Sequence, residues 1–140
     1  VQFDKFTTYL KTEAYKDLKL FRPEVIIVKL GTNDSRPDEW VNEDFFYADY
    51  LRLVRRMKSI SDQVYLCYPI LPYGFKWQQR DDILRNKVMK LIKRVSEEEQ
   101  LPVINLYREE MRDSVNYYPD GIHPTSNGYD IIAKIIYDNL

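Results

Sequence analysis

The sequence predicts one α/β domain built around a parallel β-sheet. Short segments rich in β-branched residues alternate with longer segments in which apolar residues recur at helical spacing. Strands that are separated by helices in this way form parallel βαβ units with right-handed crossovers. A chain of 140 residues supports one such domain, so residues 1–140 are predicted to be a single unit.

The predicted strands are bounded by proline or glycine. They are residues 25–30, 63–68 and 101–106. The first lies between Pro23 and Gly31, and the second ends before Pro69. Pro102 is compatible with the third strand because it stands at the beginning of that strand.

The predicted helices precede, separate and follow these strands. An opening helix covers residues 6–20, Asn42 is placed to cap the second helix, and Pro124 stands near the first turn of the last. The apolar stripes expected to face the core are Phe46, Tyr50, Leu53, Val54, Met57 and Ile60 in the second helix, Leu84, Val88, Leu91, Ile92 and Val95 in the third, and Tyr129, Ile132, Ala133, Ile136 and Leu140 in the last.

A sheet of three strands is thin, because parallel strands are normally covered on both faces and flanked at their edges. No strand is predicted before residue 25, and the sequence begins with Val1 rather than Met. We therefore expect the domain to be truncated on its N-terminal side, with further strands contributed by polypeptide that precedes Val1.

The composition excludes several classes of function. Lys and Arg number 21 against 22 Asp and Glu, so we predict no basic surface for nucleic acid. No apolar run approaches the roughly 20 residues of a membrane-spanning helix. Cys67 is the only cysteine, which rules out an internal disulfide. We expect a soluble protein, and the sequence leaves open whether it is retained in a reducing compartment or is secreted or periplasmic in a bacterium.

Two polar segments fall where strands end. Gly31-Thr32-Asn33-Asp34 follows the first strand, and Asp120-Gly121-Ile122-His123-Pro124 lies between the third strand and the last helix. Ligands of open parallel sheets bind outside the carboxyl ends of the strands. Each segment alone is also compatible with ordinary turn chemistry, and it is their joint occurrence that indicates a site.

The residue types in these segments suit acyl transfer. Asp120 can orient the imidazole of His123, which is the only histidine and therefore the only candidate for a histidine base. The side-chain amide of Asn33 can donate to an oxyanion. Gly31 allows close backbone approach, and Asp34 is expected to hold its loop by accepting backbone N–H groups.

These segments resemble blocks of the SGNH (GDSL-type) hydrolase superfamily, namely G-x-N-D at residues 31–34 and D-x-x-H followed by proline at residues 120–124. The resemblance covers essentially the whole chain and is closest to sialate O-acetylesterase-like and acetylxylan esterase-like members. It implies a flavodoxin-like, three-layer α/β/α fold and a serine esterase without metal or organic cofactor. It also implies that Asn33 is an oxyanion donor, His123 the base and acid, and Asp120 its orienting carboxylate.

The resemblance further implies a small-molecule acyl ester or an acetylated carbohydrate as substrate. Tyr68 ends the second strand before an aromatic loop at residues 70–78, which would line the acyl or leaving-group pocket. Tyr73, Phe75 and Trp77 are candidates for stacking on a sugar, although a purely structural lid is an equal alternative.

The chain departs from the family in one respect. The G-D-S block that carries the nucleophile and the glycine block of the second oxyanion donor are absent. The serines are Ser35, Ser59, Ser61, Ser96, Ser114 and Ser126, and none follows a Gly-Asp pair. We expect the nucleophile to precede Val1 and the 140 residues alone to be inactive. In a flavodoxin-like strand order the edge of strand 25–30 would then be open to self-association.

Two other functions fit the sequence less well. A non-catalytic carbohydrate-binding or scaffold remnant of the same fold would have another residue in place of the serine. A nucleotide-binding α/β domain would need a glycine-rich phosphate loop at a strand end, and the sequence has none.

Overall fold

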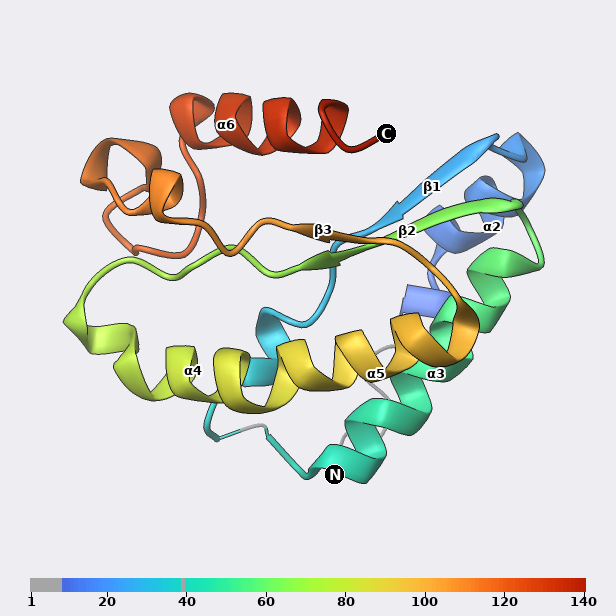
Figure 1. Cartoon of the computed structure of the whole chain (residues 1–140), viewed down its shortest axis with the longest axis horizontal. Coiled ribbons are helices and arrows are strands. Elements are labelled where there is room, and N and C mark those ends of the chain that lie inside the picture. The colour runs from blue at the N-terminus through green and yellow to red at the C-terminus, as the bar shows by residue number, and fades with distance from the viewer. Residues whose placement is uncertain (1–8, 39) are drawn as a thin grey trace.

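The computed structural model describes residues 9–38 and 40–140 and shows the expected α/β architecture (Figure 1). Residues 6–8 of the predicted opening helix lie outside the described part. The helices and strands are α2 (Glu13–Phe21), β1 (Val25–Val28), α3 (Glu43–Lys58), β2 (Gln63–Tyr68), α4 (Gln78–Ile83), a π-helical turn (Leu84–Val88), α5 (Met89–Glu99), β3 (Val103–Asn105) and α6 (Ser126–Tyr137).

The sheet of the described residues contains three parallel strands in the order β1-β2-β3. Ile27 pairs with Tyr65, and Cys67 pairs with Ile104. Because all of these strands run in the same direction, the loops that follow them leave the sheet at the same end, beyond the carboxyl ends of the strands. The polar segment after β1 and the aromatic loop after β2 are therefore neighbours.

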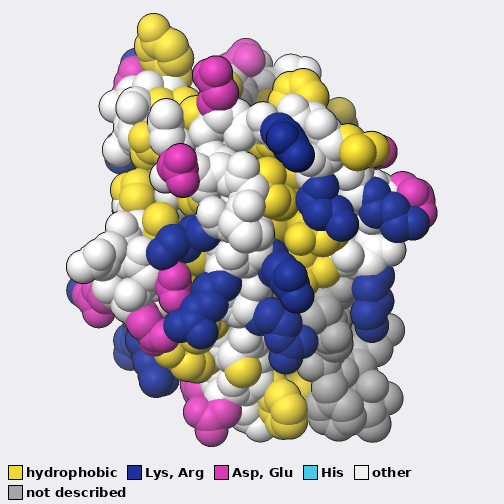
Figure 2. All heavy atoms as spheres, turned by 90° about the vertical axis from the view of Figure 1, so that its right-hand side faces the viewer, with side chains coloured by type: hydrophobic (Ala, Val, Ile, Leu, Met, Phe, Trp, Pro, Cys, Tyr) yellow, Lys and Arg dark blue, Asp and Glu magenta, His cyan; other side chains and the backbone are white. Residues whose placement is uncertain are grey.

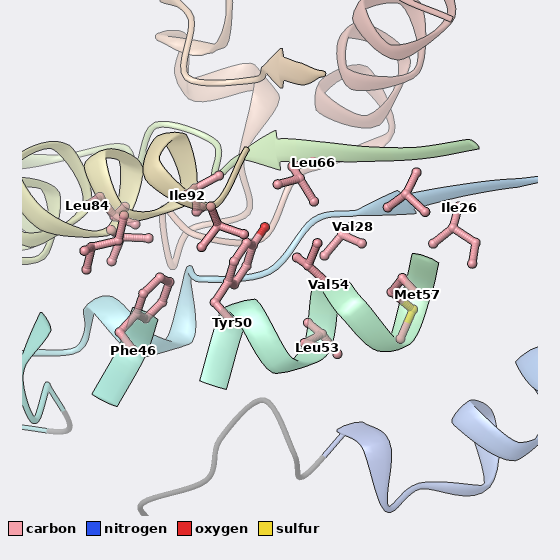
Figure 3. Close-up of a cluster of buried hydrophobic side chains, with 14 of the residues drawn as sticks. Ile26, Val28, Phe46, Tyr50, Leu53, Val54, Met57, Leu66, Leu84 and Ile92 are labelled. Atoms are coloured by element: carbon pink, nitrogen blue, oxygen red, sulfur yellow. The ribbon is translucent and has the colours of Figure 1, made fainter. Parts of the chain in front are cut away.

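Helices cover both faces of this sheet and give a three-layer arrangement (Figure 1). Helices α3 and α5 pack on one face, and α6 packs on the other through β3. In the first core, Ile26 and Val28 of β1 face the α3 side chains Leu53 and Val54 (Figure 3). The second core lies beneath α6 and includes Cys67, Ile104, Leu106, Ile132 and Ile135.

The two middle helices form where their sequence pattern predicts. The Asn42 side chain caps α3 by accepting from the Phe45 N–H at 3.0 Å, and the predicted stripe of α3 from Phe46 to Met57 is buried. The stripe from Leu84 to Val95 is buried as well, although the helix that carries it contains the π-helical turn. Such turns are often found beside functional sites.

The last helix departs from the prediction. It begins at Ser126, and the Thr125 hydroxyl caps it by accepting from the Gly128 N–H at 3.4 Å. Pro124 lies before the helix in a bridge with Tyr117. The predicted stripe was wrong at both ends, since Tyr129 and Leu140 are 55% and 58% exposed, and the buried face instead contains Gly128, Ile132 and Ile135. The buried face of α6, which packs on β3 and on the turns Glu109–Met111 and Ser114–Asn116, is therefore rotated by about one residue from the predicted stripe.

Strand β1 lies at one edge of the described sheet. Its residues Val25 and Ile27 are each 37% exposed, because α6 covers the neighbouring strands rather than β1. A groove runs along β1 and is lined by residues of α2 and α3, including Leu18, Phe21 and Met57. Figure 2 shows the molecule from the right-hand side of Figure 1, where α2 and the start of β1 lie, and hydrophobic side chains are interspersed there among Lys and Arg.

None of the helices in the described part of the chain is long and apolar enough to cross a membrane.

Candidate active site

Asp120 and His123 form a hydrogen-bonded pair in the turn that leads to α6. Nδ1 of His123 lies 2.7 Å from Oδ2 of Asp120. The other carboxylate oxygen, Oδ1, accepts the backbone N–H groups of Ile122 and His123 at 2.8 and 2.9 Å. These bonds, the His123 backbone N–H first among them, hold the pKa of Asp120 well below its usual range. The carboxylate is therefore ionised and orients the ring.

The imidazole of His123 is open to solvent. Its side chain is 73% exposed, while Nδ1 is occupied by Asp120. In the tautomer that donates Nδ1–H to the carboxylate, Nε2 carries a free lone pair that can accept a proton. The pair can therefore act as an oriented general base.

Gly121 allows the turn of Asp120 to lie against the aromatic loop. Its φ of +72° is in the left-handed region, and a Cβ there would lie 2.2 Å from the Tyr73 carbonyl oxygen. The Tyr73 N–H donates to the Gly121 carbonyl at 2.8 Å. The two segments are thus joined through their backbones, which only glycine at this position permits.

The segment after β1 contains both exposed and buried residues. Asn33 is exposed, whereas Asp34 and Ser35 are buried in the short 3₁₀ turn Asn33–Ser35. Gly31 has a φ of +113°, and a Cβ there would lie 2.9 Å from Cγ1 of Val88 in the π-helical turn. Gly31 therefore allows a close approach between this loop and the helix that packs behind it.

Arg80 and Trp77 connect the two polar segments. The Arg80 guanidinium donates to the Thr32 carbonyl at 2.5 Å and to Oδ1 of Asn33 at 3.3 Å. Trp77, at the start of α4, donates its indole N–H to the Asp120 carbonyl at 2.7 Å. Arg80 thus binds the Asn33 loop, and Trp77, three positions earlier in the sequence, binds the Asp120 turn. Asn33 and His123, one on each of these linked segments, are both exposed to solvent.

An open aromatic hollow of about 490 Å³ lies next to the Asp120 turn. Its lining includes Tyr73, Phe75, Tyr118 and Gly121. Phe75 and Tyr118 are 88% and 56% exposed. Behind them, the Tyr73 ring stacks on the buried Tyr117 ring with centroids 5.8 Å apart.

The candidate lining residues do not all belong to this hollow. Tyr73 and Phe75 line it, whereas the indole N–H of Trp77 binds the Asp120 carbonyl. Tyr68 packs against the first core at the end of β2. Sequence reasoning did not identify Tyr118 or Arg80, because neither belongs to a recognisable motif.

The structure argues against Ser35 as a nucleophile, although it is the serine nearest to Asn33 in the sequence. Its side chain is fully buried, its Oγ donates to the Thr32 carbonyl at 2.7 Å, and it accepts from Nε of Arg80 at 3.0 Å. Among residues 9–38 and 40–140, no cluster of His, Cys, Asp or Glu side chains is arranged to hold a metal ion.

The parallel sheet between helical layers, with the G-x-N-D and D-x-x-H segments beyond its strands, is the α/β architecture of the SGNH hydrolases. The chain belongs to the GDSL-like lipase/acylhydrolase family, whose model matches residues 5–131. The sequence is 26% identical, over 91% of the chain, to an acetylxylan esterase of Xylanibacter ruminicola, and it spans 31% of that protein's length.

Solved structures share the fold. A lipase/acylhydrolase of Enterococcus faecalis superposes with a TM-score of 0.79 and 21% identity, covering 98% of this chain and 70% of that one. An acetylxylan esterase of Geobacillus stearothermophilus gives 0.74 and 17%, covering 93% of this chain and 65% of that one.

Proposed function

We propose that the chain forms part of a serine esterase that removes short acyl groups, acetyl above all, from a carbohydrate. Its base and orienting acid are His123 and Asp120, its oxyanion donor is Asn33, and its nucleophilic serine belongs to polypeptide outside these 140 residues. The observation that carries the proposal is the contact of 2.7 Å between Nδ1 of His123 and Oδ2 of Asp120, beside an exposed imidazole.

The reaction follows from these groups. The serine hydroxyl oxygen attacks the ester carbonyl carbon while Nε2 of His123 takes the hydroxyl proton. The amide N–H of Asn33 donates to the oxyanion of the tetrahedral intermediate. As the C–O bond to the sugar breaks, the imidazolium returns the proton to the departing alcohol. Water then attacks the acyl-enzyme with His123 again as the base, and this releases acetate and the free serine.

The hollow beside the Asp120 turn supports a carbohydrate as the alcohol. Flat aromatic rings at Phe75 and Tyr118 can cover the apolar faces of a sugar, and the Ser114 hydroxyl and the Lys76 ammonium in the same lining can bind its hydroxyl groups. Under this proposal the sugar ring occupies the hollow while its acetyl group reaches His123.

The proposal is tested by reconstitution. We expect no turnover of 4-nitrophenyl acetate by the isolated 140-residue chain. Turnover should appear when the chain is joined to the N-terminal segment of another family member, which carries the G-D-S block. Replacement of the serine in that block by alanine should abolish this turnover. Turnover by the isolated chain that His123→Ala abolishes would refute the external nucleophile. An inactive joined protein, shown to be folded by circular dichroism, would favour a non-catalytic carbohydrate-binding role.

We also propose that the isolated chain associates with itself through β1. The strand has an edge without a partner strand in the described sheet, and its apolar residues Val25 and Ile27 are partly exposed. Such an edge is a template for pairing with another chain.

A further inference from the structure

Arg80 is a buried arginine whose hydrogen bonds converge on one loop. Only 5% of the surface of this residue is exposed. Nε lies 3.0 Å from Oγ of Ser35 and 3.2 Å from the Thr32 carbonyl oxygen, and Nη2 lies 2.5 Å from the same carbonyl. Because a buried guanidinium is costly unless its N–H groups are bound, these contacts help to offset the cost of enclosing Arg80. Its forked geometry allows it to bind several acceptors of one loop at once.

The same guanidinium determines which way the Asn33 amide faces. Nη2 of Arg80 lies 3.3 Å from Oδ1 of Asn33. An arginine has donors and no acceptor, so the Asn33 atom that faces it must be the oxygen. The Nδ2 group of Asn33 is then turned away from Arg80, and its N–H bonds are available to another acceptor. Without Arg80, the two orientations of the amide would differ much less in energy.

Arg80 is also joined to the turn of Asp120 and His123. Its guanidinium carbon lies 5.4 Å from the centroid of the Trp77 ring, whose indole N–H donates to the Asp120 carbonyl at 2.7 Å. A cation over an indole ring is an attractive contact, worth more where water is excluded. Movement of the guanidinium would therefore affect the Asn33 loop and the Asp120 turn together.

We infer that Arg80 is a positioning residue, which fixes the sense and place of the Asn33 amide relative to His123 and thereby raises kcat of the proposed esterase. The inference rests on that proposed function. An amide donor aimed at the oxyanion acts in the transition state, so misorienting it should lower kcat and leave KM for a small ester nearly unchanged.

The first measurement uses the isolated chain and needs no catalysis. We expect the side-chain amide signals of Asn33 in a ¹H–¹⁵N spectrum to shift in both Arg80→Met and Arg80→Lys, because a single ammonium cannot bind Thr32, Ser35 and Asn33 as the fork does. Arg85→Met is the matched control, since Arg85 belongs to the same helical segment and its side chain is 52% exposed. Arg80→Lys keeps the test informative if Arg80→Met fails to fold.

The second measurement uses the joined, serine-containing protein and 4-nitrophenyl acetate. We expect kcat to fall about 10- to 100-fold in Arg80→Met, with KM within about twofold, and Arg80→Lys to recover part of the loss. If the Asn33 signals do not move, or if kcat is unchanged in folded variants, the inference about Arg80 is overturned. The proposed esterase function would still stand. If the joined wild-type protein has no activity, the proposed function fails, and the amide signals still decide whether Arg80 orients Asn33.

Discussion

The indole N–H of Trp77 donates to the main-chain carbonyl of Asp120 across 2.7 Å, although the two residues lie 43 positions apart in the sequence. The neighbouring N–H of Tyr73 donates to the Gly121 carbonyl at 2.8 Å. The aromatic loop and the turn that carries His123 are thus joined by two hydrogen bonds, so a substitution that displaces one of them should also displace the other.

Gly121→Ala should destabilise the protein because two costs coincide. The residue has a φ of +72°, and the added methyl would lie 2.2 Å from the Tyr73 carbonyl oxygen, a backbone atom that cannot move aside easily. Gly74→Ala is the matched control, with a φ of +103° and no atom within 4 Å of the added methyl. We expect about 1–2 kcal/mol for Gly74→Ala and at least about 2 kcal/mol more for Gly121→Ala in urea unfolding. Equal losses would show that the loop and the turn are not in close contact.

Asp120→Asn should preserve the turn and impair the base. The Asn oxygen can still accept the N–H groups of Ile122 and His123, but its NH₂ group would face Nδ1 of His123 and favour the tautomer with the proton on Nε2. We expect kcat of the joined protein to fall about 10³- to 10⁴-fold. In the isolated chain, ¹⁵N shifts of the His123 ring should report the exchange of tautomers. An unchanged ring spectrum would show that Asp120 does not set the tautomer.

The strand and motif positions could be predicted because they depend on local chemistry. Asp120 and His123 are three residues apart, so a single turn is enough to bring their side chains into contact. The apolar residues of β2 predict a buried strand, and Val64, Leu66 and Cys67 are indeed buried. Arg80 could not be predicted in this way. It lies among the polar residues Gln78 to Asp82, which read as a solvated helix surface, and only the folded chain shows that its side chain faces Thr32 and Ser35.

The stripe of α6 was mispredicted for a related reason. Periodicity identifies a helix and its apolar residues, but it does not say how much of the helix a neighbouring strand covers. Ile132 and Ile135 are enclosed because they lie on the face of α6 that packs on β3 and on the turns Glu109–Met111 and Ser114–Asn116, whereas Tyr129 remains exposed.

The low pKa of Asp120 has a consequence at acid pH. The hydrogen bonds that the carboxylate accepts from the His123 and Ile122 backbone N–H groups lower its pKa in the folded state. In the unfolded chain the residue titrates near its ordinary value of about 3.9. The stability from the ionised carboxylate is therefore fully present above about pH 4, and it is lost as the pH falls from there through the folded-state pKa. We expect the melting temperature of the wild type to exceed that of Asp120→Asn above about pH 5, and this difference to narrow as the pH falls below about 4. A difference that does not narrow below about pH 4 would contradict the low pKa.

Leu66 tests whether the first core holds the sheet to its helices. It is fully buried in β2 and lies on the face covered by α3 and α5 (Figure 3). Leu66→Ala should cost about 2–5 kcal/mol in the free energy of unfolding, since it removes buried apolar surface and leaves a cavity. Leu20→Ala changes the same residue type at a position that is 83% exposed, and it should cost less than about 0.5 kcal/mol. Similar losses at the two sites would place Leu66 outside a packed core.

Ile27→Lys should reduce the proposed self-association through β1. Ile27 is 37% exposed on the edge strand, and charged residues, lysine above all, oppose pairing between sheet edges. We expect light scattering after size-exclusion chromatography to show oligomers of the wild-type chain and a shift toward monomer in Ile27→Lys. Val115→Lys introduces the same charge at an exposed valine of the Ser114–Asn116 turn, outside the sheet, and should leave the distribution unchanged. A wild-type chain that is monomeric at every concentration tested would show that an open strand edge alone does not drive association.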